Sequence, residues 1–196
     1  MDIILDGVIL DITIEDEKNI GDILRALERE LELNSATMVE ISADNTVIPA
    51  DKLDNLFETP IEQVQTLEVK SVTAKEVADV LKHLFEAFES LAEKLENIPV
   101  QLQKNEDKIA MNTVTELADA LSLLFQTIPY VNLFPETFDN LTIESKRPTS
   151  FISDFPSLLE DFRKAVESND TVLIGDIAEY EIAPRLRQLS ELQKSL

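Results

Sequence analysis

The sequence predicts an α+β protein in which a small N-terminal sheet with one covering helix is followed by a C-terminal four-helix bundle. Up to about residue 72, apolar residues alternate with polar ones in short runs, and from residue 73 onward they recur three and four positions apart. These are the periods of strands and of amphipathic helices, respectively. A chain of 196 residues can bury two small cores without disulfides, which agrees with the lack of cysteine. We therefore expect two domains, residues 1–72 and residues 73–196.

A β-hairpin is expected at the start of the chain, because apolar runs lie on both sides of Asp6-Gly7, a dipeptide typical of tight turns. The first run covers residues 3–5, and the second alternates through Val8, Leu10, Ile12 and Ile14. One-sided apolar spacing over residues 20–31 then predicts a helix that covers the sheet. Further strands are expected at residues 38–41, 47–48 and 64–72, with a helical turn at residues 51–57.

This order of elements resembles the ubiquitin-like β-grasp superfamily over residues 1 to about 72. The likeness is carried by Asp51-Lys52-Leu53-Asp54-Asn55-Leu56 and by Thr66-Leu67-Glu68-Val69, which look like the turn and the final strand of ubiquitin. The resemblance implies a docking scaffold, since relatives commonly serve as one. Conjugated relatives and sulfur carriers end in a free Gly-Gly, whereas this strand continues through Ser71-Val72-Thr73 into a helix, so neither activity is expected.

Four amphipathic helices are expected after residue 73. Thr73 and Glu76 have the spacing of a capping box, which marks the start of the first helix. Pro99 and a polar run separate the first helix from the second, and Pro184 is expected to bend the fourth because proline lacks a backbone donor. The four apolar stripes cover residues 77–98, 110–128, 155–166 and 174–192. A crossover at about residues 129–153 joins the second and third helices.

The formal net charge of −22 favours basic partners and opposes binding to nucleic acid or to anionic membranes. Acidic residues are spread along the chain, so a surface that only maintains solubility is the simpler explanation. The apolar runs are too short to span a bilayer, and Asp2 and Asp6 beside the first apolar run make a secretory signal unexpected. We therefore expect a cytoplasmic protein.

Few residues offer catalytic or metal-binding chemistry. Cysteine is absent, and three glycines are too few for phosphate-binding loops. The single histidine, His83, has Glu86 three residues later, but a di-iron bundle needs a second histidine and Glu-x-x-His motifs. Carboxylates for acid–base pairs are plentiful, although solvated helix faces account for them. We expect neither a catalytic residue nor a cofactor nor a bound metal.

The crossover is the strongest candidate for a partner-binding site, because irregular segments seldom carry so many apolar residues. Its aromatic residues could instead cap the end of the bundle, and its basic pair could meet an acidic helix face of the same chain. A tyrosine beside the bend at Pro184 is a second candidate, with a packed bend as the alternative. The candidate residues are Tyr130, Phe134, Phe138, Lys146, Arg147 and Tyr180.

These observations favour a non-catalytic protein–protein interaction module, an adaptor or regulatory subunit that recruits a basic or amphipathic protein segment. One alternative is an enzyme that depends on carboxylates and a metal. Another is a structural subunit that assembles with itself, since the helical seams could pair between two chains in a homodimer as readily as within one.

Overall fold

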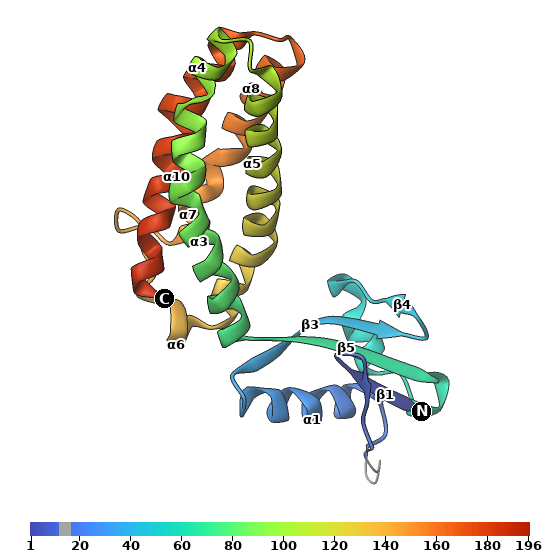
Figure 1. The fold of residues 1–196 in the computed structure, drawn as a ribbon. Helices are drawn as coiled ribbons and strands as arrows, with labels where there is room; N and C mark the ends of the chain where they lie inside the picture. Colours follow the sequence, from blue (N-terminus) through green and yellow to red (C-terminus); the bar gives the residue numbers. More distant parts are fainter. Residues whose placement is uncertain (12–16) are drawn as a thin grey trace. The chain divides into compact units, whose positions relative to one another are not determined.

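The computed structural model describes residues 1–11 and 17–196, which form two compact units, Met1–Glu76 and Val77–Leu196 (Figure 1). The N-terminal unit contains a five-stranded sheet, and the C-terminal unit is helical. The predicted α+β class is therefore confirmed. Strand β5 ends at Thr73 and the next helix begins at Ala74.

The sheet has the strand order β2-β1-β5-β3-β4, with β1 parallel to β5 and all other neighbours antiparallel. The second strand is shorter than predicted: it ends at Ile9, although the amide of Leu10 still donates to the carbonyl of Ile3 at 2.8 Å. Ile12 and Ile14, also predicted to continue it, lie outside the described residues. The strands are β1 (Asp2–Leu5), β2 (Val8–Ile9), β3 (Ala36–Ala43), β4 (Thr46–Val47) and β5 (Thr66–Thr73).

Two acidic turn residues fix both hairpins to the central strand β5. Asp6 and Asp44 adopt left-handed backbone conformations, which suit tight hairpin turns, with φ of 49° and 47°. The Asp6 carboxylate accepts hydrogen bonds from the amide and hydroxyl of Ser71 at 2.8 and 2.7 Å. Asp44 accepts from the amides of Gln65 and Thr66, both at 2.9 Å. The turns thus set the register of the strands on each side of β5.

Helix α1 (Ile20–Glu32) covers one face of the sheet (Figure 1). It begins with a capping box in which Asn19 accepts from the amide of Asp22 at 2.9 Å. Its apolar stripe and the facing strand residues form a buried core with the short helix α2 (Leu53–Phe57), which follows the 3₁₀ turn η1 (Ala50–Lys52). The core residues are Ile3, Ile20, Ile23, Leu24, Leu27, Ile41, Leu56, Val64, Leu67 and Val69.

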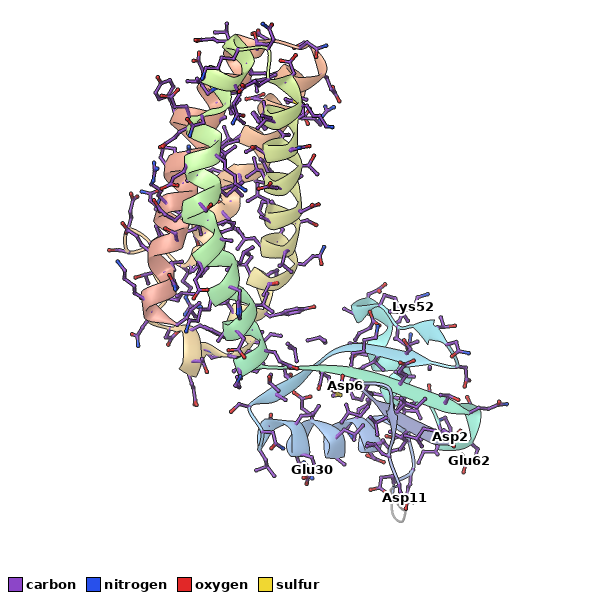
Figure 2. All side chains as sticks on the ribbon, in the orientation of Figure 1. Asp2, Asp6, Asp11, Glu30, Lys52 and Glu62 are labelled. Atoms are coloured by element: carbon purple, nitrogen blue, oxygen red, sulfur yellow. The ribbon has the colours of Figure 1, made fainter. Side chains whose placement is uncertain are left out.

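Acidic side chains are distributed over the surface of the N-terminal unit. The exposed residues Asp2, Asp11, Glu30 and Glu62 come from a strand, a loop, helix α1 and the 3₁₀ turn η2 (Ile61–Gln63) (Figure 2). The negative charge of this unit is therefore not confined to one element.

The helical unit is built mainly from α3 (Ala74–Glu96), α4 (Ile98–Gln103), α5 (Asp107–Thr127), α8 (Phe155–Glu167), α9 (Thr171–Asp176) and α10 (Ala183–Ser190). The predicted capping box is present, because the amide of Thr73 donates to Glu76 at 2.8 Å and the amide of Glu76 donates to the Thr73 hydroxyl at 3.1 Å. The chain ends in the 3₁₀ turn η6 (Glu191–Ser195).

Pro99 acts differently from the prediction, because a proline in the first turn of a helix starts the helix rather than ending it. Helix α3 ends at Glu96, and Pro99 lies in the first turn of α4. Pro184 lies, as predicted, inside the fourth helical segment, which runs without a break from Thr171 to Ser190 and contains the π-helical turn η5 (Ile177–Ile182) just before the proline. A π turn accommodates the extra residue where the regular hydrogen-bond ladder is interrupted.

The predicted crossover is a series of short helical turns. Pro129, Pro135 and Pro148 each lie in the first turn of one of them, where the fixed φ of proline suits helix initiation. The turns are η3 (Ile128–Leu133), α6 (Pro135–Phe138), α7 (Pro148–Phe151) and η4 (Ile152–Asp154).

Arg187 ties α10 to α3. Its guanidinium donates two hydrogen bonds to the carboxylate of Glu96, one of them at 2.9 Å, and one to Glu89 at 3.1 Å. The bond from Arg187 holds the pKa of Glu96 below its ordinary value, against the opposing effect of burial. Gln193 of η6 extends this contact along α3 by donating to Glu86 at 2.7 Å.

We expect Gly21→Ala to destabilise the N-terminal unit by about 1–3 kcal/mol, because an added Cβ would lie 2.6 Å from Phe57 Cδ1 and 2.8 Å from the Phe57 carbonyl oxygen. Alanine normally stabilises a helix relative to glycine, so the sign of the effect identifies the clash. Amide hydrogen exchange of α1 and β5 measures the change. In a Phe57→Leu background the loss should be smaller, and an equal loss there would contradict the predicted clash.

We expect Glu96→Gln to lower the free energy of unfolding by about 0.2–1 kcal/mol at neutral pH, the range of partly exposed ion pairs. The pKa of Glu96 is lower in the folded state than its ordinary value of 4.5. The stabilisation is therefore present above that value and is lost as the pH falls below it. Urea unfolding between about pH 3 and pH 7 measures the difference between variant and wild type. Glu191→Gln in η6 serves as the control, and a difference that does not shrink in acid would count against the assignment.

Candidate functional site

Phe134 and Phe138, predicted to bind a partner, are buried within the helical unit. Their exposed fractions are 9% and 4%, and their rings pack edge to face with centroids 6.5 Å apart. Leu141 and Ile143, which follow them, are buried as well. These phenylalanines therefore form no exposed surface in this structure, and their binding to a partner stays a prediction. They belong to the core, the alternative that the sequence left open, because the short turns fold their side chains inward.

The basic pair of the crossover lies on the surface. Lys146 closes a tight hairpin with Ile143, in which each residue's amide donates to the other's carbonyl at 2.8 and 2.9 Å. Arg147 is exposed and forms an ion pair with Asp139 at 2.8 Å. Its charge thus meets an acidic residue of the same chain. Tyr130 is half-buried in η3.

Tyr180 lies in the π-helical turn η5, and 65% of its surface is exposed. A hydrogen bond with Glu179 raises the pKa of its hydroxyl, and the nearby carboxylates of Glu179 and Asp176 act in the same direction. The side chain is therefore accessible and protonated. The candidate residues as a group do not form one site, because two are in the core and the others come from separate turns.

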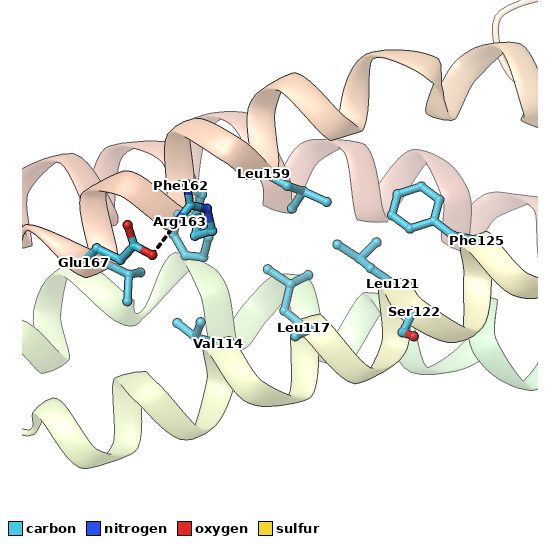
Figure 3. Close-up of a pocket in the computed structure, with 11 residues that line it drawn as sticks. Val114, Leu117, Leu121, Ser122, Phe125, Leu159, Phe162, Arg163 and Glu167 are labelled. Carbon is cyan, nitrogen blue, oxygen red and sulfur yellow. Dashed lines mark hydrogen bonds and ion pairs between the residues drawn. The ribbon is translucent and has the colours of Figure 1, made fainter.

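An apolar groove of about 570 Å³ separates helices α5 and α8 (Figure 3). On α5 the lining residues recur three and four positions apart, so they share one face of the helix. Those on α8 have the same spacing and point toward them across the groove (Figure 3). Helix α5 contributes Val114, Leu117, Ala118, Leu121, Ser122 and Phe125. Helix α8 contributes Leu159, Phe162, Arg163, Val166 and Glu167.

The groove has a buried floor and accessible walls. Leu117, Leu121 and Phe162 are only 2–4% exposed and form the floor. Ala118 and Ser122 are exposed in the middle of the α5 wall, where their small side chains leave space. Apolar surface of this kind gains free energy when another apolar surface covers it.

The charges at the edge of the groove are predominantly negative. Arg163 is its basic lining residue, and the guanidinium pairs with Glu160 at 2.8 Å and with Glu167 (Figure 3). The hydrogen bond from Arg163 lowers the pKa of Glu160 to about 2, and the two carboxylates raise the pKa of Arg163. Asp119 is exposed on α5 beside Ala118. Lys164 also lies 3.6 Å from the carboxylates of Glu160 and Asp161, so three carboxylates of α8 face two basic side chains and leave a net negative charge.

The sequence prediction missed this groove, because the stripes on α5 and α8 have the spacing of ordinary core helices. The available signal was the width of the α5 stripe. It includes Val114 and Phe125 in addition to the buried positions Leu117, Leu121 and Leu124.

Metal-ligand geometry is absent from the described part of the chain, where no group of three or more histidine and acidic side chains could hold an ion. His83 is exposed, and its Nδ1 lies 2.6 Å from the carbonyl oxygen of Asp79, which is one turn earlier on α3.

None of the helices within residues 1–11 and 17–196 combines the length and apolar character needed to span a membrane.

Each unit matches a family model of its own. The model described as domain of unknown function (DUF8042) matches residues 79–192, and the model described as TP0873 N-terminal domain matches residues 1–73. A protein of Treponema pallidum (strain Nichols), described as uncharacterized, is 27% identical over 191 residues. This alignment covers 97% of the chain and 95% of that relative. No solved structure matches the chain.

We expect Phe138→Ala to lower the free energy of unfolding of the helical unit by about 3–5 kcal/mol, as truncation of a buried aromatic residue does. Tyr180→Ala should change it by less than about 0.5 kcal/mol, because the side chain is mostly exposed. Chemical denaturation monitored by circular dichroism measures both values. A small effect at Phe138 would mean that its ring is available to a partner.

Proposed function

The chain belongs to the DUF8042 family, and we propose that it is a non-catalytic adaptor or regulatory subunit whose helical unit binds a segment of another protein. One observation carries this proposal: the groove between α5 and α8 is concave, almost entirely apolar and accessible. An apolar groove between helices is a common way in which proteins bind peptide segments.

The composition of the groove favours binding over catalysis. Catalytic sites place acid, base or nucleophilic groups against a reacting atom. Here the polar lining residues are Ser122, Arg163 and Glu167, and the last two pair with each other. The Glu167 carboxylate and the Arg163 guanidinium are therefore paired with each other. The rest of the groove is apolar and can bind a partner through dispersion contacts and the hydrophobic effect.

The proposal includes a finer description of both units. The N-terminal unit is a ubiquitin-like β-grasp domain, supported by the parallel pairing of β1 with β5 and by the single long helix packed on the sheet. The helical unit is a four-helix bundle formed by α3 with α4, by α5, by α8, and by α9 with α10. The protein is proposed to act in the cytoplasm.

This proposal moves the contact site from the crossover to the groove. Lys146 and Tyr180 are exposed and stay candidates for additional contacts, whereas Phe134 and Phe138 are buried. The partner is proposed to be a protein with a basic or amphipathic segment, because the chain has a net charge of −22. Binding to nucleic acid is disfavoured for the same reason.

We expect a photo-crosslinking amino acid at Ser122, on the groove wall, to capture one specific protein in the cells that produce the chain. The same amino acid at Leu123 should not, because Leu123 is exposed on α5 but does not line the groove. Mass spectrometry of the crosslinked species identifies the captured protein. Equal capture at both positions, or none at either, would contradict binding through the groove.

A further inference from the structure

We infer that the groove binds a single amphipathic α-helix of about three turns, with its apolar side on the floor and lysine or arginine residues at its edges. This inference rests on the proposed function and names the kind of segment that the groove accepts. Three properties of the groove support it: its length, the state of its backbone groups and the charge at its edge.

The length of the groove matches a short helix. Val114 and Phe125 mark the extremes of the α5 wall and are eleven positions apart, which is about 16 Å at 1.5 Å per residue. A helix of about eleven residues has the same length and presents apolar side chains at i, i+4 and i+7 on one face. Ala118 and Ser122 leave space near the middle of this wall for one large central side chain.

The walls favour a helix over an extended segment. Helices α5 and α8 direct their interior backbone amides and carbonyls into their own hydrogen bonds, so a bound strand would find no backbone partners there. Backbone groups left unpaired against the apolar floor would be costly. A helix satisfies its backbone groups internally and buries only side chains.

The charge at the edge favours basic residues on the bound helix. On α8, Arg163 and Lys164 pair with Glu160, Asp161 and Glu167, which leaves one net negative charge, and Asp119 is exposed on α5. Lysine or arginine beside these carboxylates would gain attraction, whereas glutamate would be repelled. A second copy of this chain, which also has a net charge of −22, is for the same reason a poor occupant.

The direct test uses the full chain and three fluorescent peptides of about 14 residues, the length of a three- to four-turn helix. One peptide places leucines on one helical face and lysines on the other. The second replaces lysine by glutamate, and the third scrambles the first so that its leucines no longer share a face. By fluorescence anisotropy, the first should bind at least about tenfold more tightly than the others, a difference typical of one or two good contacts.

Groove variants locate the binding. Ala118→Trp fills the groove from an exposed wall position and should weaken binding of the leucine–lysine peptide by about tenfold or more. Leu123→Trp places the same side chain outside the groove and should leave binding unchanged. Circular dichroism of both variants checks that the fold is retained. Glu167→Lys should weaken binding of the lysine peptide several-fold and strengthen that of the glutamate peptide.

Equal binding of the ordered and scrambled peptides, or an Ala118→Trp variant that binds like wild type, would overturn the inference. If the crosslinker at Ser122 still captures a protein in that case, the proposed function stands and the occupant is not a basic helix. Self-association of the chain in sedimentation velocity that Ala118→Trp abolishes would identify a second copy as the occupant and overturn the inference as well.

Discussion

The longer helices of the described residues carry apolar stripes, and stability depends on covering these stripes, since each 100 Å² of exposed apolar surface costs about 2.5 kcal/mol. The apolar stripe of α1 packs on the sheet. Helices α3 and α10 are joined by the Arg187–Glu96 ion pair. Between α5 and α8 the cover is incomplete. The same physical requirement that holds the units together thus leaves one accessible apolar face, and the proposed function follows from it.

The polar contacts in the chain fix the positions of turns and side chains and add little to the free energy of unfolding. Asp6 and Asp44 attach the hairpin turns to β5 through hydrogen bonds to backbone amides. Around the groove, Glu160 and Glu167 hold Arg163 at the edge of the apolar floor. Exposed ion pairs of this kind contribute little free energy, but they determine which charges a partner meets. In the proposed function, the negative edge would contribute selectivity and the apolar floor would contribute affinity.

The prolines show why local signals can be misinterpreted. Proline disrupts the interior of a helix but is well accommodated in its first turn, so its effect depends on where the helix begins. Pro99 lies in the first turn of α4 rather than between two helices, whereas Pro184 lies inside a continuous helical segment, as predicted. The π-helical turn before Pro184 accommodates the missing backbone donor, and Tyr180 within it is exposed.

The sequence alone determined the order and type of the elements, because strand and helix periods and capping boxes such as Thr73 with Glu76 act between near neighbours. Only the tertiary structure decided which apolar residues are covered. Phe138 and Phe125 are the same amino acid, yet the first is buried and the second lines the groove. Exposure depends on which distant segments pack at each position, and no spacing within one helix contains that information.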